Sequence, residues 1–158
     1  MSSFVNDTKL FRAVFDGDYL AAKAAVESGA NLNGLPGSCF PPIVIATAAN
    51  HARMVEYLLQ QGADPDRQVS TDDPSPLLRA FAGFGARALH IAAANGYIQI
   101  VRSLLRRGRA DPNATNGKGC TPLMLSFKYP DACEEVVRLL LEAGADPALA
   151  KEDGLTAL

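Results

Sequence analysis

Apolar residues recur along the chain at the spacing of an amphipathic helix. In three stretches an apolar residue is followed three and four positions later by two leucines: Val55, Leu58 and Leu59; Val101, Leu104 and Leu105; and Val137, Leu140 and Leu141. This spacing places three side chains on one helix face, so each stretch predicts a helix with a buried side. One such helix cannot bury that side alone, whereas a stack of them forms a continuous core.

Each apolar stretch ends in the same way. The segments VESGANLN (26–33), LLQQGADPD (58–66), LLRRGRADPN (104–113) and LLLEAGADP (139–147) close with a glycine, which tolerates the left-handed conformation at a helix end, and continue into a polar turn. The closing glycines are Gly29, Gly62, Gly108 and Gly144. Their spacings are 62 − 29 = 33, 108 − 62 = 46 and 144 − 108 = 36, which predicts a repeat with insertions.

The beginnings of the units repeat as well. TPLMLSF (121–127) is the most regular, RALHIAAANGY (87–97) keeps Leu-His and Ala-Ala, PPIVIATAANH (41–51) keeps proline and small residues, and LFRAVFDGD (10–18) is degenerate. With these openings and the 33-residue period, the chain resembles the ankyrin-repeat family over nearly its whole length. The resemblance implies a helix, a tight turn, a second helix and a finger-like turn in each unit.

We therefore expect an all-α ankyrin-repeat solenoid that forms one domain over residues 1–158. The expected repeats are residues 4–35, 36–68, 82–115 and 116–150, with a partial fifth at 151–158 and a long finger loop at 69–81. The last residues, KEDGLTAL, open a unit without completing it. From this we expect the natural protein to continue beyond Leu158 with further repeats or another domain.

The long finger loop is the largest departure from the repeat. Its prolines and its Ser/Asp cluster predict irregular backbone. Leu77, Leu78, Phe81 and Phe84 nevertheless make it apolar, so it either folds back on the inner helices or forms an exposed patch for a partner. Ser75, which precedes Pro76, is a candidate phosphorylation site.

The amino-acid composition limits the class of binding partner and the cellular compartment that we expect. Fifteen Lys and Arg against 17 Asp and Glu give a net charge of −2, which argues against a nucleic-acid partner. No apolar run has the roughly 18–20 residues of a membrane span, and the N-terminus lacks signal-peptide character. Cys39, Cys120 and Cys133 are odd in number and widely spaced, which favours reduced thiols and a cytoplasmic or nuclear location.

The sequence contains few residues in patterns typical of catalytic, metal-binding or phosphate-binding sites. Cys and His do not occur at metal-ligand spacing, no glycine loop has the phosphate-binding form, and His51 and His90 fall at different repeat positions. We therefore expect no enzyme, no cofactor and no small-molecule substrate. By the resemblance, His90 bonds to neighbouring backbone. Arg102, Arg106, Arg107 and Arg109 form a basic cluster that is either a solvated face or a site for an acidic partner.

The resemblance also implies where a partner binds. In the family the binding surface is usually the concave side, which finger tips and inner helices form. Carried over by position, this surface comprises Ser38, Phe40, Ala48, Ala49, Phe84, Ala86, Ala94, Asn95, Lys118, Cys120, Lys128 and Tyr129. The exposed-patch interpretation adds Leu77, Leu78 and Phe81 of the loop. Asn113, in its ADPNA context, resembles the asparagine that some ankyrin repeats present for hydroxylation.

The sequence thus predicts a monomeric, non-catalytic module that recognises a protein partner. The unfinished fifth repeat favours the targeting or scaffold part of a larger protein. The alternative is a stand-alone adaptor or inhibitor, similar to the small four-repeat kinase inhibitors.

Overall fold

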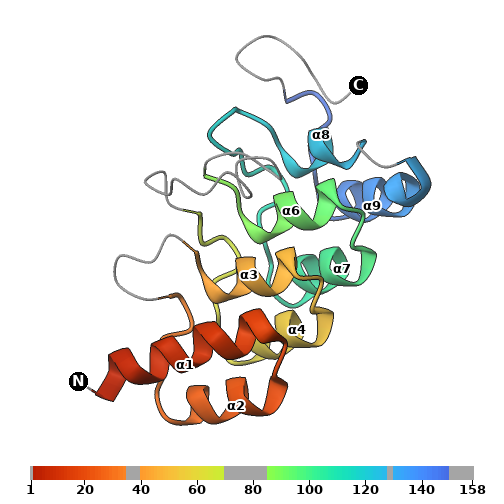
Figure 1. The fold of residues 1–158 in the computed structure, drawn as a ribbon. Helices are drawn as coiled ribbons and strands as arrows, with labels where there is room; N and C mark the ends of the chain where they lie inside the picture. The colour runs from red at the N-terminus through yellow and green to blue at the C-terminus, as the bar shows by residue number, and fades with distance from the viewer. Residues whose placement is uncertain (1, 35–39, 70–84, 128–129, 150–158) are drawn as a thin grey trace.

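A computed structural model shows, in the residues that it describes, eight helices arranged as four pairs (Figure 1). It describes residues 2–34, 40–69, 85–127 and 130–149, with backbone only for 2–3 and 130–133. The pairs are α1 (Ser2–Asp16) with α2 (Tyr19–Glu27), α3 (Pro42–Ala48) with α4 (Ala52–Gln60), α6 (Ala88–Ala94) with α7 (Ile98–Arg106), and α8 (Pro122–Ser126) with α9 (Pro130–Glu142).

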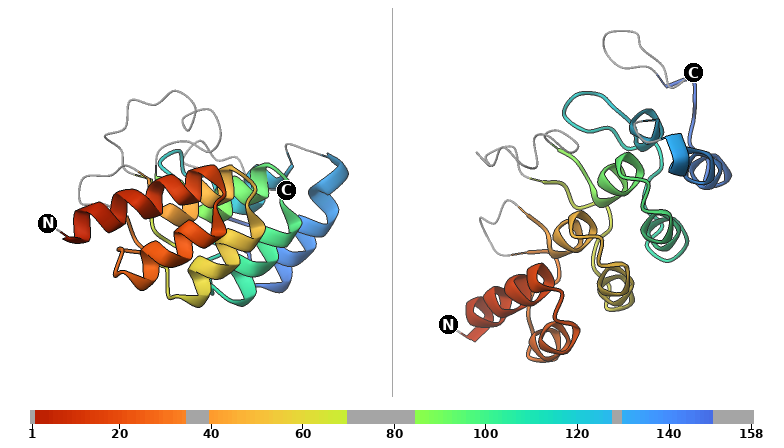
Figure 2. Two further views of the ribbon diagram at one scale, coloured as in Figure 1. Left: turned by 60° about the horizontal axis from the view of Figure 1, so that its bottom comes forward. Right: turned by 45° about the vertical axis from the view of Figure 1, so that its right-hand side comes forward.

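The four pairs stack in chain order and form two layers (Figure 2). Helices α1, α3, α6 and α8 form the inner layer, and α2, α4, α7 and α9 form the outer layer. Each inner helix packs on its own outer helix and on the next inner helix, as nearest-neighbour stacking requires. The described residues contain no strand, so the predicted all-α solenoid is confirmed. No described helix is both long and apolar enough to cross a bilayer.

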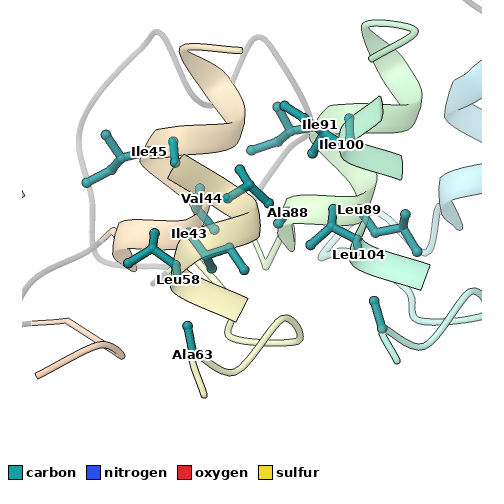
Figure 3. Packing of buried hydrophobic residues seen from close by; sticks show 14 of the residues in the cluster. Ile43, Val44, Ile45, Leu58, Ala63, Ala88, Leu89, Ile91, Ile100 and Leu104 are labelled. Atoms are coloured by element: carbon teal, nitrogen blue, oxygen red, sulfur yellow. The ribbon is translucent and has the colours of Figure 1, made fainter. Parts of the chain in front are cut away.

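Small and branched apolar side chains fill the space between pairs. Ile43 and Val44 of α3, Leu58 of α4, and Leu89 and Ile91 of α6 are buried, and they belong to one core cluster that spans the second and third pairs (Figure 3). The inner helices also bury several alanines, whose single methyl groups allow close helix approach. Of the residues at the helical period read from the sequence, Val55, Leu58, Val101, Leu104 and Leu140 belong to this core.

The two ends of the stack differ in polarity. Arg12 of α1 occupies the position that Ile45 occupies one period later (45 − 12 = 33), yet its side chain is exposed whereas Ile45 is buried. The first pair therefore has a charged side chain at a position that is part of the core in the second pair. At the other end, Leu141 is exposed although its helical spacing predicts a core position, so that prediction is wrong. Its equivalents Leu59 and Leu105 are partly buried in the core because another helix pair follows each of them.

The turns use left-handed backbone where the repeat requires it. Gly62 closes α4 with φ 93°, and Asn50 takes the glycine position between α3 and α4 with φ 56°. The third repeat differs because of one inserted residue, Arg109. There the left-handed residue is Arg109 itself, with φ 54°, and Gly108 instead lies so close to Leu59 that a Cβ atom would be 2.9 Å from its Cδ2.

A row of Asp and Asn side chains holds the bases of the fingers: the first pair lies within the first repeat, and the other three pairs each join one repeat to the next. In each case a side-chain oxygen accepts a backbone N–H farther along the chain. The pairs are Asp7 with Asn31 (2.6 Å), Asn33 with Asp64 (3.0 Å), Asp66 with Asp111 (3.1 Å) and Asn113 with Asp146 (2.7 Å). We call Asp7, Asn33, Asp66 and Asn113 the Asx ladder. The next position in this series is Ala148, which has no side-chain acceptor.

The described residues on either side of the long insertion lie next to each other. The backbone N–H of Val69 donates to the carbonyl of Ala86 at 2.9 Å, and both residues are buried. The two attachment points of the insertion are therefore close together. This explains how 13 additional residues (46 − 33 = 13) fit between the second and third pairs while α4 still packs on α7.

Candidate protein-binding surface

The exposed ends of the inner helices form the first part of the surface. Ala48 and Ala49, at the end of α3, are exposed as predicted for the concave side. Phe15 occupies the same position one period earlier (48 − 15 = 33) and is 67% exposed. The predicted set omitted Phe15. The 33-residue spacing is the signal that identifies it, although the degenerate opening of this repeat obscures the alignment.

Three residues predicted for this surface are buried instead. Ala86, Ala94 and Cys120 are 2%, 2% and 4% exposed, so they present no area to a partner. Ala86 and Cys120 lie at the base of a finger, where the carbonyl of Ala86 accepts from Val69 and the N–H of Cys120 donates to Asn116. Ala94 is buried although Ala48, the equivalent residue of the second repeat, is exposed. Position within the repeat therefore overstates their accessibility.

Three further predicted residues remain accessible in part or in full. Lys118, at the tip of the last described finger, is exposed. Asn95 is half-buried, and its amide donates to the carbonyl of Ile91 at 2.8 Å within α6. Phe40 is half-buried and packs against the core. The accessible surface is thus largely uncharged on the inner helices, with a cation at a finger tip.

The other predicted contact residues lie outside the described residues. They are Ser38, Leu77, Leu78, Phe81, Phe84, Lys128 and Tyr129, together with the candidate phosphorylation site Ser75. For these residues the expectation from the sequence stays a prediction.

His90 is a structural residue, as the resemblance implies. Its Nε2 lies 3.0 Å from the carbonyl oxygen of Cys120 in the next finger, while its Nδ1 accepts the N–H of Arg87 at 3.3 Å. Because Nδ1 accepts, Nε2 carries the proton that bonds Cys120. Burial lowers the pKa of His90 to about 4, so the ring is neutral near pH 7.

Arg87 joins the second and third repeats and stands where the regular opening has threonine. Its Nε donates to the carbonyl of Asp66 in the second repeat, and one terminal nitrogen donates to the carbonyl of Thr115 at the end of the third, both at 3.0 Å. The guanidinium group thus ties the beginning of the third repeat to the preceding repeat and to its own last residue. It is committed to structure rather than to a partner.

Asn113, the candidate for hydroxylation, is bonded through both ends of its amide. Its Oδ1 accepts from Asp146 at 2.7 Å and its Nδ2 donates to the carbonyl of Gly144 at 2.9 Å. These two bonds hold the third finger to the fourth repeat. Its hydroxylation stays a prediction, but its structural role is plain.

Two members of the basic cluster bridge neighbouring outer helices. Arg107 pairs with Glu56 of α4 at 2.8 Å, and Arg102 pairs with Glu135 of α9 at 3.1 Å. Neither Arg106 nor Arg109 has an ion pair with any described residue. The cluster therefore serves partly to connect repeats, and exposed pairs of this kind contribute about 0–1 kcal/mol each.

The described residues contain no group of three or more His, Cys, Asp or Glu side chains that could hold a metal ion. His90 and Arg87 are engaged in hydrogen bonds that hold the repeats together, and Lys118 is exposed. What the surface offers is a rigid, largely uncharged face for contact.

Four stacked helix pairs with this face define a helical-repeat protein of the kind that serves in protein–protein interaction. Residues 70–151 match the pattern "Ankyrin repeats (3 copies)" and residues 10–59 match "Ankyrin repeats (many copies)". The chain belongs to the ankyrin-repeat family. Such repeats are generally non-catalytic interaction modules.

The chain is similar to proteins from distant organisms. It is 29% identical to the ankyrin repeat protein YahD of Escherichia coli (strain K12), over 89% of this chain and 65% of that protein. It is 33% identical to Ankyrin repeat and SOCS box protein 6 of Homo sapiens, over 86% of this chain and 31% of that protein. It is 39% identical to BTB/POZ domain and ankyrin repeat-containing protein NPR5 of Oryza sativa subsp. japonica, over 46% of this chain and 14% of that protein. It thus spans less than two thirds of each relative.

Proposed function

We propose that this stack is a non-catalytic recognition module that holds a protein partner against its concave face. One observation carries the proposal: Phe15, Ala48 and Ala49 are exposed, uncharged and held in one row by stacked inner helices. A pre-ordered surface loses little conformational entropy when it binds, and apolar contacts suit a protein better than a phosphate backbone or a polar metabolite.

We propose further that the module is the targeting or scaffold part of a larger protein. Two relatives support this, because their names combine ankyrin repeats with a SOCS box or a BTB/POZ domain and this chain spans only 31% and 14% of them. The free, buried thiol of Cys120 is consistent with a reducing compartment, so we place the protein in the cytoplasm or nucleus.

The concave face is tested by enlarging one exposed alanine. Ala48→Arg places a long, charged side chain among the exposed residues at the end of α3. We expect the amount of partner that the immobilised chain recovers to fall at least about tenfold, which corresponds to about 1.4 kcal/mol of binding free energy. Ala24→Arg is the matched control, because Ala24 is an exposed alanine on the outer helix α2. Equal recovery by both variants, measured by quantitative mass spectrometry, would remove the α3 row from the binding site.

The long loop is tested by replacing residues 70–84 with Asn-Gly. The change removes 13 residues and restores a 33-residue spacing between Gly62 and Gly108 (46 − 13 = 33). Because Val69 and Ala86 already close the base, we expect the stack to stay folded by circular dichroism. Partner recovery should decrease if Leu77, Leu78, Phe81 and Phe84 contact the partner. Unchanged recovery would assign the binding to the stack alone.

A further inference from the structure

Helix α1 carries an exposed apolar strip that the core does not use. Phe4 and Phe15 are 65% and 67% exposed, Thr8 is exposed, and Phe11 is half-buried at the edge of the core. At 100° per residue these four side chains lie within about 60° of one another around the helix. We call Phe4, Thr8, Phe11 and Phe15 the α1 strip.

The spacing of the α1 strip is that of a coiled-coil seam. Its members are separated by 4, 3 and 4 residues, which is the alternation by which one helix packs its side chains into another. None of the four is charged. The only polar member, Thr8, donates its hydroxyl to the carbonyl of Phe4 at 2.9 Å, so its methyl group can be covered without leaving an unsatisfied donor. The strip therefore fits a helix with an apolar face.

The strip is complementary to itself when two copies run antiparallel. A twofold axis across its centre brings together residues whose numbers add to 19, because 4 + 15 = 19 and 8 + 11 = 19. Phe4 then faces Phe15 of the other copy, and Thr8 faces Phe11. Two Phe–Phe layers flank two Thr–Phe layers, and no layer contains a charge. Helix α1 lies at one end of the stack, where α2 and α3 are the described helices that pack closely on it (Figure 1).

We propose that α1 is a self-association surface through which two copies of this chain pair antiparallel, in place of the monomer expected from the sequence. Aromatic side chains bury about 150–250 Å² each, so two strips together cover on the order of 800 Å². Stable, specific interfaces cover more than this, about 1,200–2,000 Å². The dimer is accordingly weak and reversible.

The test is sedimentation equilibrium of the purified whole chain with two opposite-charge variants. The wild-type mass should rise with concentration from 16.7 kDa toward twice that value. Phe4→Glu alone and Phe15→Lys alone each place two charges against phenylalanine, and each should raise the dissociation constant at least about tenfold. Both positions are mostly exposed, so both variants should keep the wild-type circular dichroism spectrum.

Mixing the two variants distinguishes this arrangement from any other. In an antiparallel pair, Glu at position 4 of one copy meets Lys at position 15 of the other, while the second Phe–Phe layer is intact. The mixture should therefore dimerise again, and added salt should weaken it. Leu20→Glu is the control, because Leu20 is 76% exposed on α2 and outside the strip, and it should dimerise as the wild type does.

Two results would overturn the proposal: a wild type that stays monomeric throughout, or a mixture that stays monomeric. The first would leave the strip to a helix of a different protein, and the second would show that two copies do not pair antiparallel through it. The measurement uses this chain alone, so it is independent of whether the concave face binds a partner.

Discussion

Arg109 holds a backbone conformation that the other repeats assign to glycine. At φ 54° a residue with a Cβ atom is strained by about 1–2 kcal/mol. Glycine avoids this strain, but it loses more conformational entropy on folding, so only part of that energy is recovered. Arg109→Gly should therefore stabilise the protein by about 1 kcal/mol, measured by the midpoint of urea unfolding. Arg106→Gly, in ordinary helical backbone at the end of α7, should lower the midpoint. If the two variants shift it in the same direction, the strain assigned to Arg109 is absent.

His90 makes the stability of the stack depend on pH. Its pKa of about 4 lies below the unfolded value of 6.5, so between these values the unfolded chain binds more protons. The contribution of His90 to the free energy of unfolding is complete above pH 6.5 and falls by about 3 kcal/mol as the pH decreases to 4. Methionine is the residue at the equivalent position of the fourth repeat, Met124. His90→Met should therefore lower the free energy of unfolding at pH 7 but make that free energy less dependent on pH. Urea titrations across this range compare the slopes, and parallel slopes would contradict the assignment.

At the scale of elements, the four helix pairs are coupled through single ladder residues. Asn113→Ala removes two bonds to the fourth repeat, with an expected loss of about 1–3 kcal/mol. Because contacts are between neighbours, amide exchange should accelerate mainly in α8 and α9. Asn33→Ala is the mirror experiment and should act mainly on α1 and α2. A uniform change along the chain in both variants would show that the stack opens as one unit.

The elements themselves were predictable because their signals are local. Leucine spacing, closing glycines and the Thr-Pro opening each depend on a few adjacent residues, so the four pairs fall where expected. Leu141 was misassigned because its burial depends on the neighbour beyond α9 rather than on its own helix. The transfer of left-handed backbone from Gly108 to Arg109 likewise follows from packing against Leu59, a contact that spans the repeats.

At the scale of the molecule, the concave face was only partly predictable. Carrying positions between repeats identifies Ala48, Ala49 and Lys118 as accessible residues, but it includes Ala86, Ala94 and Cys120, which hydrogen bonds and neighbouring chain segments bury. It also omits Phe15, because the first repeat has the most degenerate opening. Exposure is a property of the assembled stack, and a repeat register alone does not contain it.

The Asx ladder gives the stack a direction. Every acceptor belongs to an earlier part of the chain than the backbone N–H that it receives, beginning with Asp7 and ending with Asn113. A ribosome releases the chain from its N-terminus, so each finger that emerges meets an acceptor on a repeat already made. The order of synthesis and the order of hydrogen bonding therefore coincide, and no completed repeat has to wait for a later one to supply its acceptor in this series.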